Sequence, residues 1–166
     1  PFASLRRVVL TPARGVVGRA GRALGTGLGA LCPASGQAAK FITLFTRMPS
    51  GDEFVSSSTL YGGSFQQFDV SFRKLGINAR FVDASDLDSW KSAITDKTKC
   101  LYAEIMGNPK IDVLDIAGVA KIAHDAGVPL VVDNTFASPY LCRPSDRAAD
   151  IAVPSSPRVL VGHGTT

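Results

Sequence analysis

The 166-residue sequence has few of the residues that build disulfide frameworks and metal sites. Its three cysteines, Cys32, Cys100 and Cys142, are too few and too widely spaced for either pattern. His124 and His163 are the only histidines, so we expect no metal. No stretch approaches the roughly 20 uninterrupted apolar residues of a membrane span. We therefore expect a protein of the reducing cytoplasm that has no membrane partner.

Acidic residues are absent from the first 51 positions, which carry seven basic ones. The formal net charge of +4 arises there, because the rest of the chain is mildly acidic. A nucleic-acid-binding protein would spread Lys and Arg over a folded face, so we expect no nucleic-acid partner. Residues 1–32 are rich in Gly, Ala and Arg and show no clear hydrophobic period. We interpret them as an aberrant leader, a sequence error being favoured over an organelle transit peptide.

A dinucleotide-binding pattern, G-x-G-x-x-A, occurs within this leader at residues 25–30. The pattern needs a preceding strand and an acidic residue about 20 positions later. The segment before it does not resemble a strand, and the first acidic residue is Asp52. We interpret the match as chance, which leaves a nicotinamide-dependent oxidoreductase as a remote alternative.

What is present from residue 35 onward is an alternation of helical and strand patterns. The apolar fraction of 45% and the charged fraction of 19% are typical of a globular protein. The alternation predicts an α/β sandwich with a mostly parallel sheet. Helices are expected at residues 37–48, 64–75, 86–94 and from about 116 to Gly127, and strands at residues 53–57, 77–82, 100–105, 128–132 and 150–153.

Ligands of such sheets bind beyond the carboxyl ends of the strands. Residues 35–39 form a small-residue turn that opens a helix, which suits either a phosphate or an ordinary Ser N-cap. Asp133 ends an apolar strand, where a carboxylate needs a cation or several donors. A protonated ring nitrogen of a cofactor would serve, and so would a cap of the next segment. Tyr61 suits stacking on a flat ligand or packing on its turn, and Asn108 suits a ligand contact or an Asn-Pro turn.

Taken in order, five segments resemble the Cys/Met-metabolism family of pyridoxal-phosphate enzymes, with the O-acetylhomoserine sulfhydrylase branch as the best match. The similarity covers about residues 33–166, the middle of a longer family chain. The segments are SGQAA at residues 35–39, SSTLYGG at 57–63, GNPK at 107–110, VVDNTFASPYL at 131–141 and GHGT at 162–165.

The resemblance implies a three-layer α/β/α sandwich that is a truncated large domain of the type I aminotransferase-like fold, in residues 33–166. Pyridoxal 5′-phosphate would be the cofactor. Gly36 and Gln37 would hold its phosphate with Ser155, and Tyr61 would stack on its ring. Asn108 would bond the ring hydroxyl, and Asp133 would pair with the ring nitrogen. The intact family implies a homo-oligomer of the tetramer-of-dimers type that acts on a small amino-acid substrate.

The sequence departs from the family pattern where the pattern requires a Schiff-base lysine, because Arg158 occupies that position. A guanidinium keeps its proton and is a poor nucleophile. By resemblance the function is a transferase that makes homocysteine from O-acetylhomoserine and sulfide, and we expect this chain to be inactive, with no catalytic residue. The alternative is a non-catalytic remnant that binds pyridoxal phosphate or serves as an assembly partner.

Overall fold

The computed structural model describes residues 8–10, 29–31 and 33–155. Within these residues, seven parallel strands form one sheet in the order β2-β1-β7-β6-β5-β3-β4. The predicted α/β fold with a parallel sheet is therefore confirmed. The strands are β1 (Val8–Leu10), β2 (Gly29–Leu31), β3 (Glu53–Ser57), β4 (Asn78–Val82), β5 (Thr98–Glu104), β6 (Leu130–Asp133) and β7 (Ile151–Ala152).

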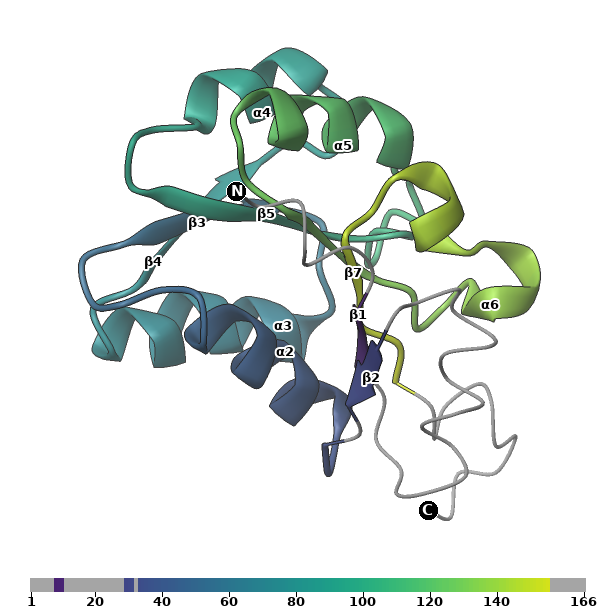
Figure 1. Ribbon diagram of the computed structural model, residues 1–166, viewed down its shortest axis with the longest axis horizontal. Helices are drawn as coiled ribbons and strands as arrows, with labels where there is room; N and C mark the ends of the chain where they lie inside the picture. Colours follow the sequence, from purple (N-terminus) through teal and green to yellow (C-terminus); the bar gives the residue numbers. More distant parts are fainter. Residues whose placement is uncertain (1–7, 11–28, 32, 156–166) are drawn as a thin grey trace.

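Helices cover both faces of the sheet and complete the three layers (Figure 1). One layer holds α2 (Gly36–Phe45) and α3 (Gly62–Gln66), which continues into the π-helical segment η1 (Gln67–Phe72). The other layer holds α4 (Leu87–Ala93) and α5 (Ile116–Asp125). Two short helices, α6 (Ser138–Leu141) and the 3₁₀ segment η2 (Pro144–Arg147), follow β6.

Residues of β5 point alternately into the two layers, as the two-residue period of a strand requires. Cys100 and Tyr102 join the core under α2 and α3, whereas Leu101 and Ala103 join the core under α4 and α5. All four residues of β6 are buried, as expected for a strand covered on both faces. The centre of the sheet is thus dry, and polar groups at its carboxyl end need partners from the protein.

Polar caps and glycines set the helix boundaries. The side chains of Ser35, Asp86 and Asp115 accept hydrogen bonds from backbone N–H groups in the first turns of α2, α4 and α5. Gly76 and Gly127 follow the helical segments with φ angles of 75° and 72°, a left-handed conformation that other residues rarely adopt. The predicted helix ends at these two glycines are confirmed.

Two features of the fold were not predicted. Strands β1 and β2 lie within residues 1–32. They pair with each other, and β1 also pairs with β7. Each of these strands has only three residues and lies in a Gly-rich sequence, so the two-residue hydrophobic period that would predict a strand cannot be seen. The segment from Ser138 to Arg147 forms α6 and η2, which are too short to show a helical period.

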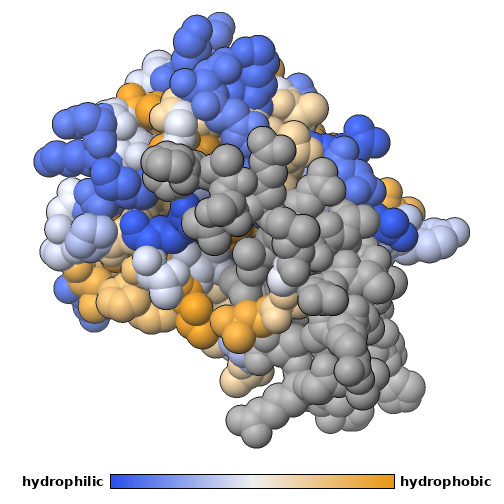
Figure 2. Space-filling model, in the orientation of Figure 1, coloured by the Kyte–Doolittle hydropathy of each residue, from blue (hydrophilic) through white to orange (hydrophobic). Residues whose placement is uncertain are grey.

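The surface differs between the two helical layers. Figure 2 shows apolar side chains along the lower edge, where α2 and α3 lie, and hydrophilic ones over the upper layer. Phe45 of α2 and Phe65 of α3 are 45% and 41% exposed.

No described helix is long and apolar enough to cross a membrane. In the same part of the chain, no group of three or more His, Cys, Asp or Glu residues is placed to hold a metal ion.

Cys100 is expected to resist alkylation in the folded protein. It is completely buried, and burial raises the pKa of its thiol to about 12. At pH 8 only about one thiol in ten thousand would be a thiolate, the reactive form. Cys142 is partly exposed and provides the internal comparison. In a Cys32→Ser background, iodoacetamide followed by peptide mass spectrometry should label Cys142 and spare Cys100 until urea is added. Equal labelling of both cysteines without urea would contradict the buried position of β5.

Candidate functional site

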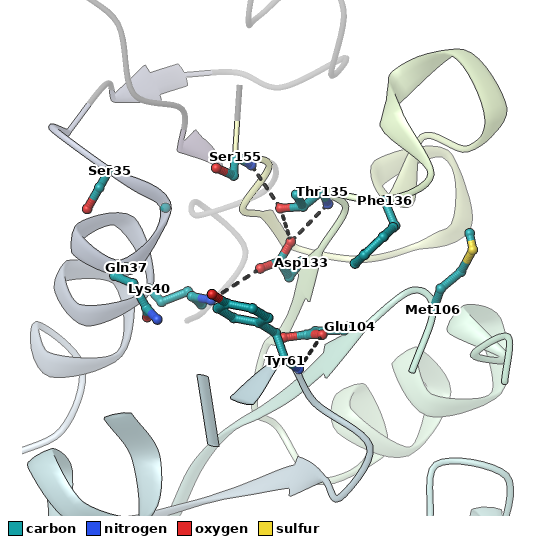
Figure 3. A pocket seen from close by; sticks show the side chains of 11 residues that line it. Ser35, Gln37, Lys40, Tyr61, Glu104, Met106, Asp133, Thr135, Phe136 and Ser155 are labelled. Atoms are coloured by element: carbon teal, nitrogen blue, oxygen red, sulfur yellow. Dashed lines mark hydrogen bonds and ion pairs between the residues drawn. The ribbon is translucent and has the colours of Figure 1, made fainter. Parts of the chain in front are cut away.

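A cavity of about 250 Å³ opens at the carboxyl ends of the central strands, where the sequence predicted ligand binding. The loops after β3, β5, β6 and β7 meet there with the first turn of α2 (Figure 3). The lining residues are Ser35, Gly36, Gln37, Lys40, Tyr61, Glu104, Met106, Asp133, Thr135, Phe136 and Ser155.

Five of the six predicted cofactor-binding residues, Gly36, Gln37, Tyr61, Asp133 and Ser155, line this cavity. The cofactor contacts assigned to them stay predictions.

Asn108 is the sixth predicted residue, and it does not line the cavity. It is partly exposed in the turn after β5 and precedes Pro109. Its assigned contact with a ring hydroxyl stays a prediction. Arg158 lies outside the described residues.

The first turn of α2 presents backbone N–H groups to the cavity. The hydroxyl of Ser35 caps the N–H of Ala38 at 3.1 Å. Gly36 and Gln37 have no preceding helical turn to supply carbonyl acceptors, so their N–H groups are available beside the positive end of the helix dipole. A Cβ on Gly36 would lie 3.1 Å from Cβ and Oγ of Ser155, so glycine allows these two segments to approach closely.

Gln37 also carries a buried polar atom that the described protein does not satisfy. Its Oε1 atom has no hydrogen-bond partner among the described residues. Such atoms are uncommon in native proteins and commonly mark a missing water, ion or ligand. As an acceptor, this oxygen calls for a donor and does not itself attract an anion, so it is the N–H groups of the first turn that make the end of the cavity next to α2 suited to an anionic group.

Asp133 is the last residue of β6, and its carboxylate is held by a hydrogen-bonded chain. Thr135 donates to Oδ1 from its backbone nitrogen at 2.9 Å and from its hydroxyl at 2.5 Å. The Thr135 hydroxyl in turn accepts from the backbone nitrogen of Ser155 at 2.9 Å. Tyr102 donates to Oδ2 at 3.4 Å. These donors stabilise a carboxylate at a position that is only 8% exposed.

Lys40 was not among the site residues predicted from the sequence, but it is buried in the cavity wall. Its Nζ atom donates to the Ser64 hydroxyl at 2.6 Å and lies 3.6 Å from Oδ2 of Asp133. It also lies 5.9 Å from the centroid of the Tyr61 ring. A sequence signal existed: Lys40 follows Gly36 by four positions, which places both on one face of a helix.

Glu104 was also missed, although it ends β5 as Asp133 ends β6. The two residues are register partners across these parallel strands. Glu104 accepts from the backbone nitrogen of Tyr61 at 2.9 Å and from the Ser64 hydroxyl at 2.8 Å. Burial and then the charge of Asp133 raise the pKa of Glu104. Burial and the same two carboxylates raise the pKa of Tyr102, so its hydroxyl keeps its proton and acts as a donor.

The arrangement suits a flat ligand with an anionic group at one end. The first turn of α2 and Ser155 offer donors for a phosphate, and the Tyr61 ring offers an aromatic face. Asp133 places a negative charge at the end of β6, where it pairs with a cation or with donors. The residues therefore fit pyridoxal phosphate as the resemblance implies, with Lys40 as a feature that the resemblance did not anticipate.

Replacing Glu104 with Gln is expected to remove part of the pH dependence of stability. Because the pKa of Glu104 is raised in the folded state, the native protein holds a proton that the unfolded chain has already lost. The free energy of unfolding therefore falls as the pH rises from the ordinary range of a glutamate pKa to the raised one. The slope is at most about 1.4 kcal/mol per pH unit within that window.

Urea unfolding curves across the acidic and neutral range measure this effect. The Glu104→Gln variant should show a flatter fall than the original chain, and Asp125→Asn should not, because Asp125 is exposed and pairs with the exposed Lys121 one turn away in α5. A Glu104→Gln variant that kept the full slope would show that another group is responsible.

Comparison with known proteins supplies the family. The sequence profile of the Cys/Met metabolism PLP-dependent enzymes matches residues 6–166, starting well before residue 33. The O-acetyl-L-homoserine sulfhydrylase of Leptospira meyeri is 46% identical over 99% of this chain, and the homocysteine/cysteine synthase of Saccharomyces cerevisiae is 43% identical over 87% of it. The chain spans only 37% and 33% of the lengths of these two relatives.

A solved structure agrees with the sequence comparison. A putative O-acetylhomoserine (thiol)-lyase of Campylobacter jejuni, which contains a pyridoxyl-lysine phosphate, matches with a TM-score of 0.88 and 33% identity. The match covers 91% of this chain and 37% of that one. With the profile matching nearly the whole sequence, the chain belongs to the Cys/Met metabolism family of pyridoxal-phosphate-dependent enzymes.

Proposed function

We propose that this chain forms the cofactor-binding part of a pyridoxal-phosphate-dependent sulfhydrylase, which makes homocysteine from O-acetylhomoserine and sulfide. The observation that carries the proposal is the cavity that brings Gly36, Gln37, Tyr61, Asp133 and Ser155 together. The names of the relatives from Leptospira and yeast support the choice of substrate and product. Since the chain spans about a third of those relatives, the complete reaction is assigned to the longer family protein.

The phosphate is proposed to bind at the start of α2. The N–H groups of Gly36 and Gln37 and the hydroxyl of Ser155 would donate to its oxygens. A phosphate there gains from the helix dipole as well as from the hydrogen bonds. A Cβ on Gly36 would lie 3.1 Å from Cβ and Oγ of Ser155. A side chain at residue 36 would therefore disturb the proposed phosphate site.

The ring is proposed to lie against Tyr61 with its nitrogen near Asp133. When bound, pyridoxal phosphate supplies an electron sink for the bonds at the amino-acid α-carbon. Tyr61 would stack on the ring, and its backbone nitrogen is held in place by Glu104. The buried carboxylate of Asp133 is oriented by Thr135, so it is fixed before a ligand arrives.

Arg158 limits what the chain does with the cofactor. A guanidinium does not lose its proton in the working pH range, so it neither attaches to the aldehyde nor moves a proton at the substrate α-carbon. We therefore propose that this chain holds the cofactor without a covalent bond and is catalytically inactive. The same substitution favours the alternative function, a non-catalytic protein that binds pyridoxal phosphate or an assembly partner.

A cytoplasmic location and a homo-oligomeric state are also proposed. Large apolar side chains remain exposed in the described part of the chain, including Val113 at 76%, Tyr140 at 93% and Leu141 at 70%. Tyr140 and Leu141 are neighbours in α6, and large apolar residues exposed side by side are typical of protein interfaces. They support contacts with other copies, or with the remainder of a longer family chain.

An Arg158→Lys variant is expected to attach the cofactor covalently. An amine at residue 158 would condense with the aldehyde and release water, and borohydride would reduce the resulting C=N bond to a stable amine. With equimolar pyridoxal phosphate, peptide mass spectrometry should find a pyridoxyl group at residue 158 in the variant and none on the original chain. Attachment to the original chain, or none to a folded variant that binds the cofactor, would contradict the proposal.

A Gly36→Ala variant is expected to weaken cofactor binding on the order of tenfold, about 1.4 kcal/mol. The new methyl group would press on Ser155 and move the first turn of α2 away from the phosphate. Gly62→Ala is the matched control, because a Cβ there meets nothing within 4 Å. Equilibrium dialysis with pyridoxal phosphate measures both. Equal affinities for the two variants would place the phosphate elsewhere.

A further inference from the structure

Lys40 is the only buried lysine or arginine among the described residues. Its side chain is 6% exposed, and a buried ammonium group is costly unless opposite charge and hydrogen bonds compensate for the lost water. The compensation comes from Asp133 at 3.6 Å, the Ser64 hydroxyl at 2.6 Å and the face of the Tyr61 ring. The lysine therefore belongs to the wall of the cavity and does not extend into solvent.

The acceptor positions of Asp133 are already in use. A carboxylate offers about four lone-pair positions. Thr135 donates twice to Oδ1, while Tyr102 and Lys40 both approach Oδ2. A ligand N–H aimed at Oδ2 would have to share this oxygen with the ammonium group or displace it.

Glu104 also faces Lys40, but it does not draw the ammonium group away from Oδ2 of Asp133. Glu104 is reached through Ser64, whose hydroxyl accepts from Lys40 and donates to Glu104. The two carboxylate oxygens of Glu104 already accept from the Tyr61 backbone nitrogen and the Ser64 hydroxyl, and the Tyr102 hydroxyl stays neutral because burial raises its pKa. The carboxylate of Asp133 is thus the principal counter-charge of the ammonium group.

We propose that Lys40 is a specificity-determining residue that occupies the counter-ion position of Asp133, so that the cavity binds a phosphorylated aromatic aldehyde whose ring nitrogen carries no proton. The inference rests on the proposed function, since it assumes that pyridoxal phosphate enters this cavity. A second cation next to Asp133 would be repelled by Lys40, whereas an unprotonated ring nitrogen accepts a hydrogen bond from the ammonium group. Without that proton the ring is a weaker electron sink.

The same geometry separates Lys40 from the covalent role of a cofactor lysine. In pyridoxal phosphate the aldehyde carbon is para to the ring nitrogen. A ring whose nitrogen lies at Asp133 therefore directs its aldehyde away from Lys40, which lies 3.6 Å from the same carboxylate. Lys40 is expected to stay unmodified when the complex is reduced with borohydride.

The test measures the protonation state of the bound ring directly. Pyridoxal phosphate labelled at the ring nitrogen is bound to the full chain, and its nitrogen NMR shift is recorded for the original protein and for Lys40→Met. Methionine keeps an unbranched apolar stem and removes the charge. The control is Lys121→Met, which changes an exposed lysine of α5. In parallel, the affinities of pyridoxal phosphate and of an analogue with C–H in place of the ring nitrogen are measured by dialysis.

The original chain and Lys121→Met should show an unprotonated ring nitrogen, and Lys40→Met a protonated one. Affinity for pyridoxal phosphate should rise on the order of tenfold in Lys40→Met, with little change for the analogue. A protonated nitrogen in the original chain would overturn the inference and leave the proposed function intact. A pyridoxyl group on Lys40 after borohydride would overturn the inference together with the proposed non-covalent binding of the cofactor. The protonation state of the ring nitrogen in the original chain can be measured even if the Lys40→Met variant does not fold. Absence of cofactor binding to the original chain and to Lys40→Met would overturn both.

Discussion

The carboxylate of Asp133 ends a strand that is buried on both faces, and the organisation of the cavity depends on how this charge is compensated. Thr135 orients one oxygen and links it to the backbone of Ser155, so the loop after β7 is held against the end of β6. Lys40 supplies the positive charge from α2. One buried anion therefore connects three segments that are distant in the sequence and gives the cavity its shape.

Because the protein itself supplies a counter-ion for Asp133, this cavity differs from one in which the ligand has to neutralise the carboxylate. An anion without an internal counter-ion would select a cationic ligand, because the ligand would then provide the missing charge. In this cavity the ammonium group of Lys40 already lies 3.6 Å away, and Glu104 is satisfied by Tyr61 and Ser64. The charges of Asp133 and Glu104 are therefore compensated by protein groups before a ligand binds. Ligand selection then depends more on the proposed phosphate-binding turn at Gly36.

The fold was largely predictable because its signals are local. The two-residue alternation at residues 77–82, which became β4, and the helical period of α5 follow from which side chains must be buried in each element. Gly76 and Gly127 marked helix ends through their left-handed backbone, a requirement of the residue itself. Strands β1 and β2 were missed because three-residue strands have no measurable period, and their place in the sheet depends on the pairing of β1 with β7.

By itself, the sequence determined the alternating order of elements, the small-residue start of α2 and the carboxylate at the end of β6, since each is a property of a short segment. It also placed an arginine where the family pattern has its lysine. Only the tertiary structure decided that Lys40 meets Asp133 and that Glu104 lies in register beside it. Such contacts depend on sheet order and helix packing, and burial then forces the charges to pair because water is no longer available to solvate them.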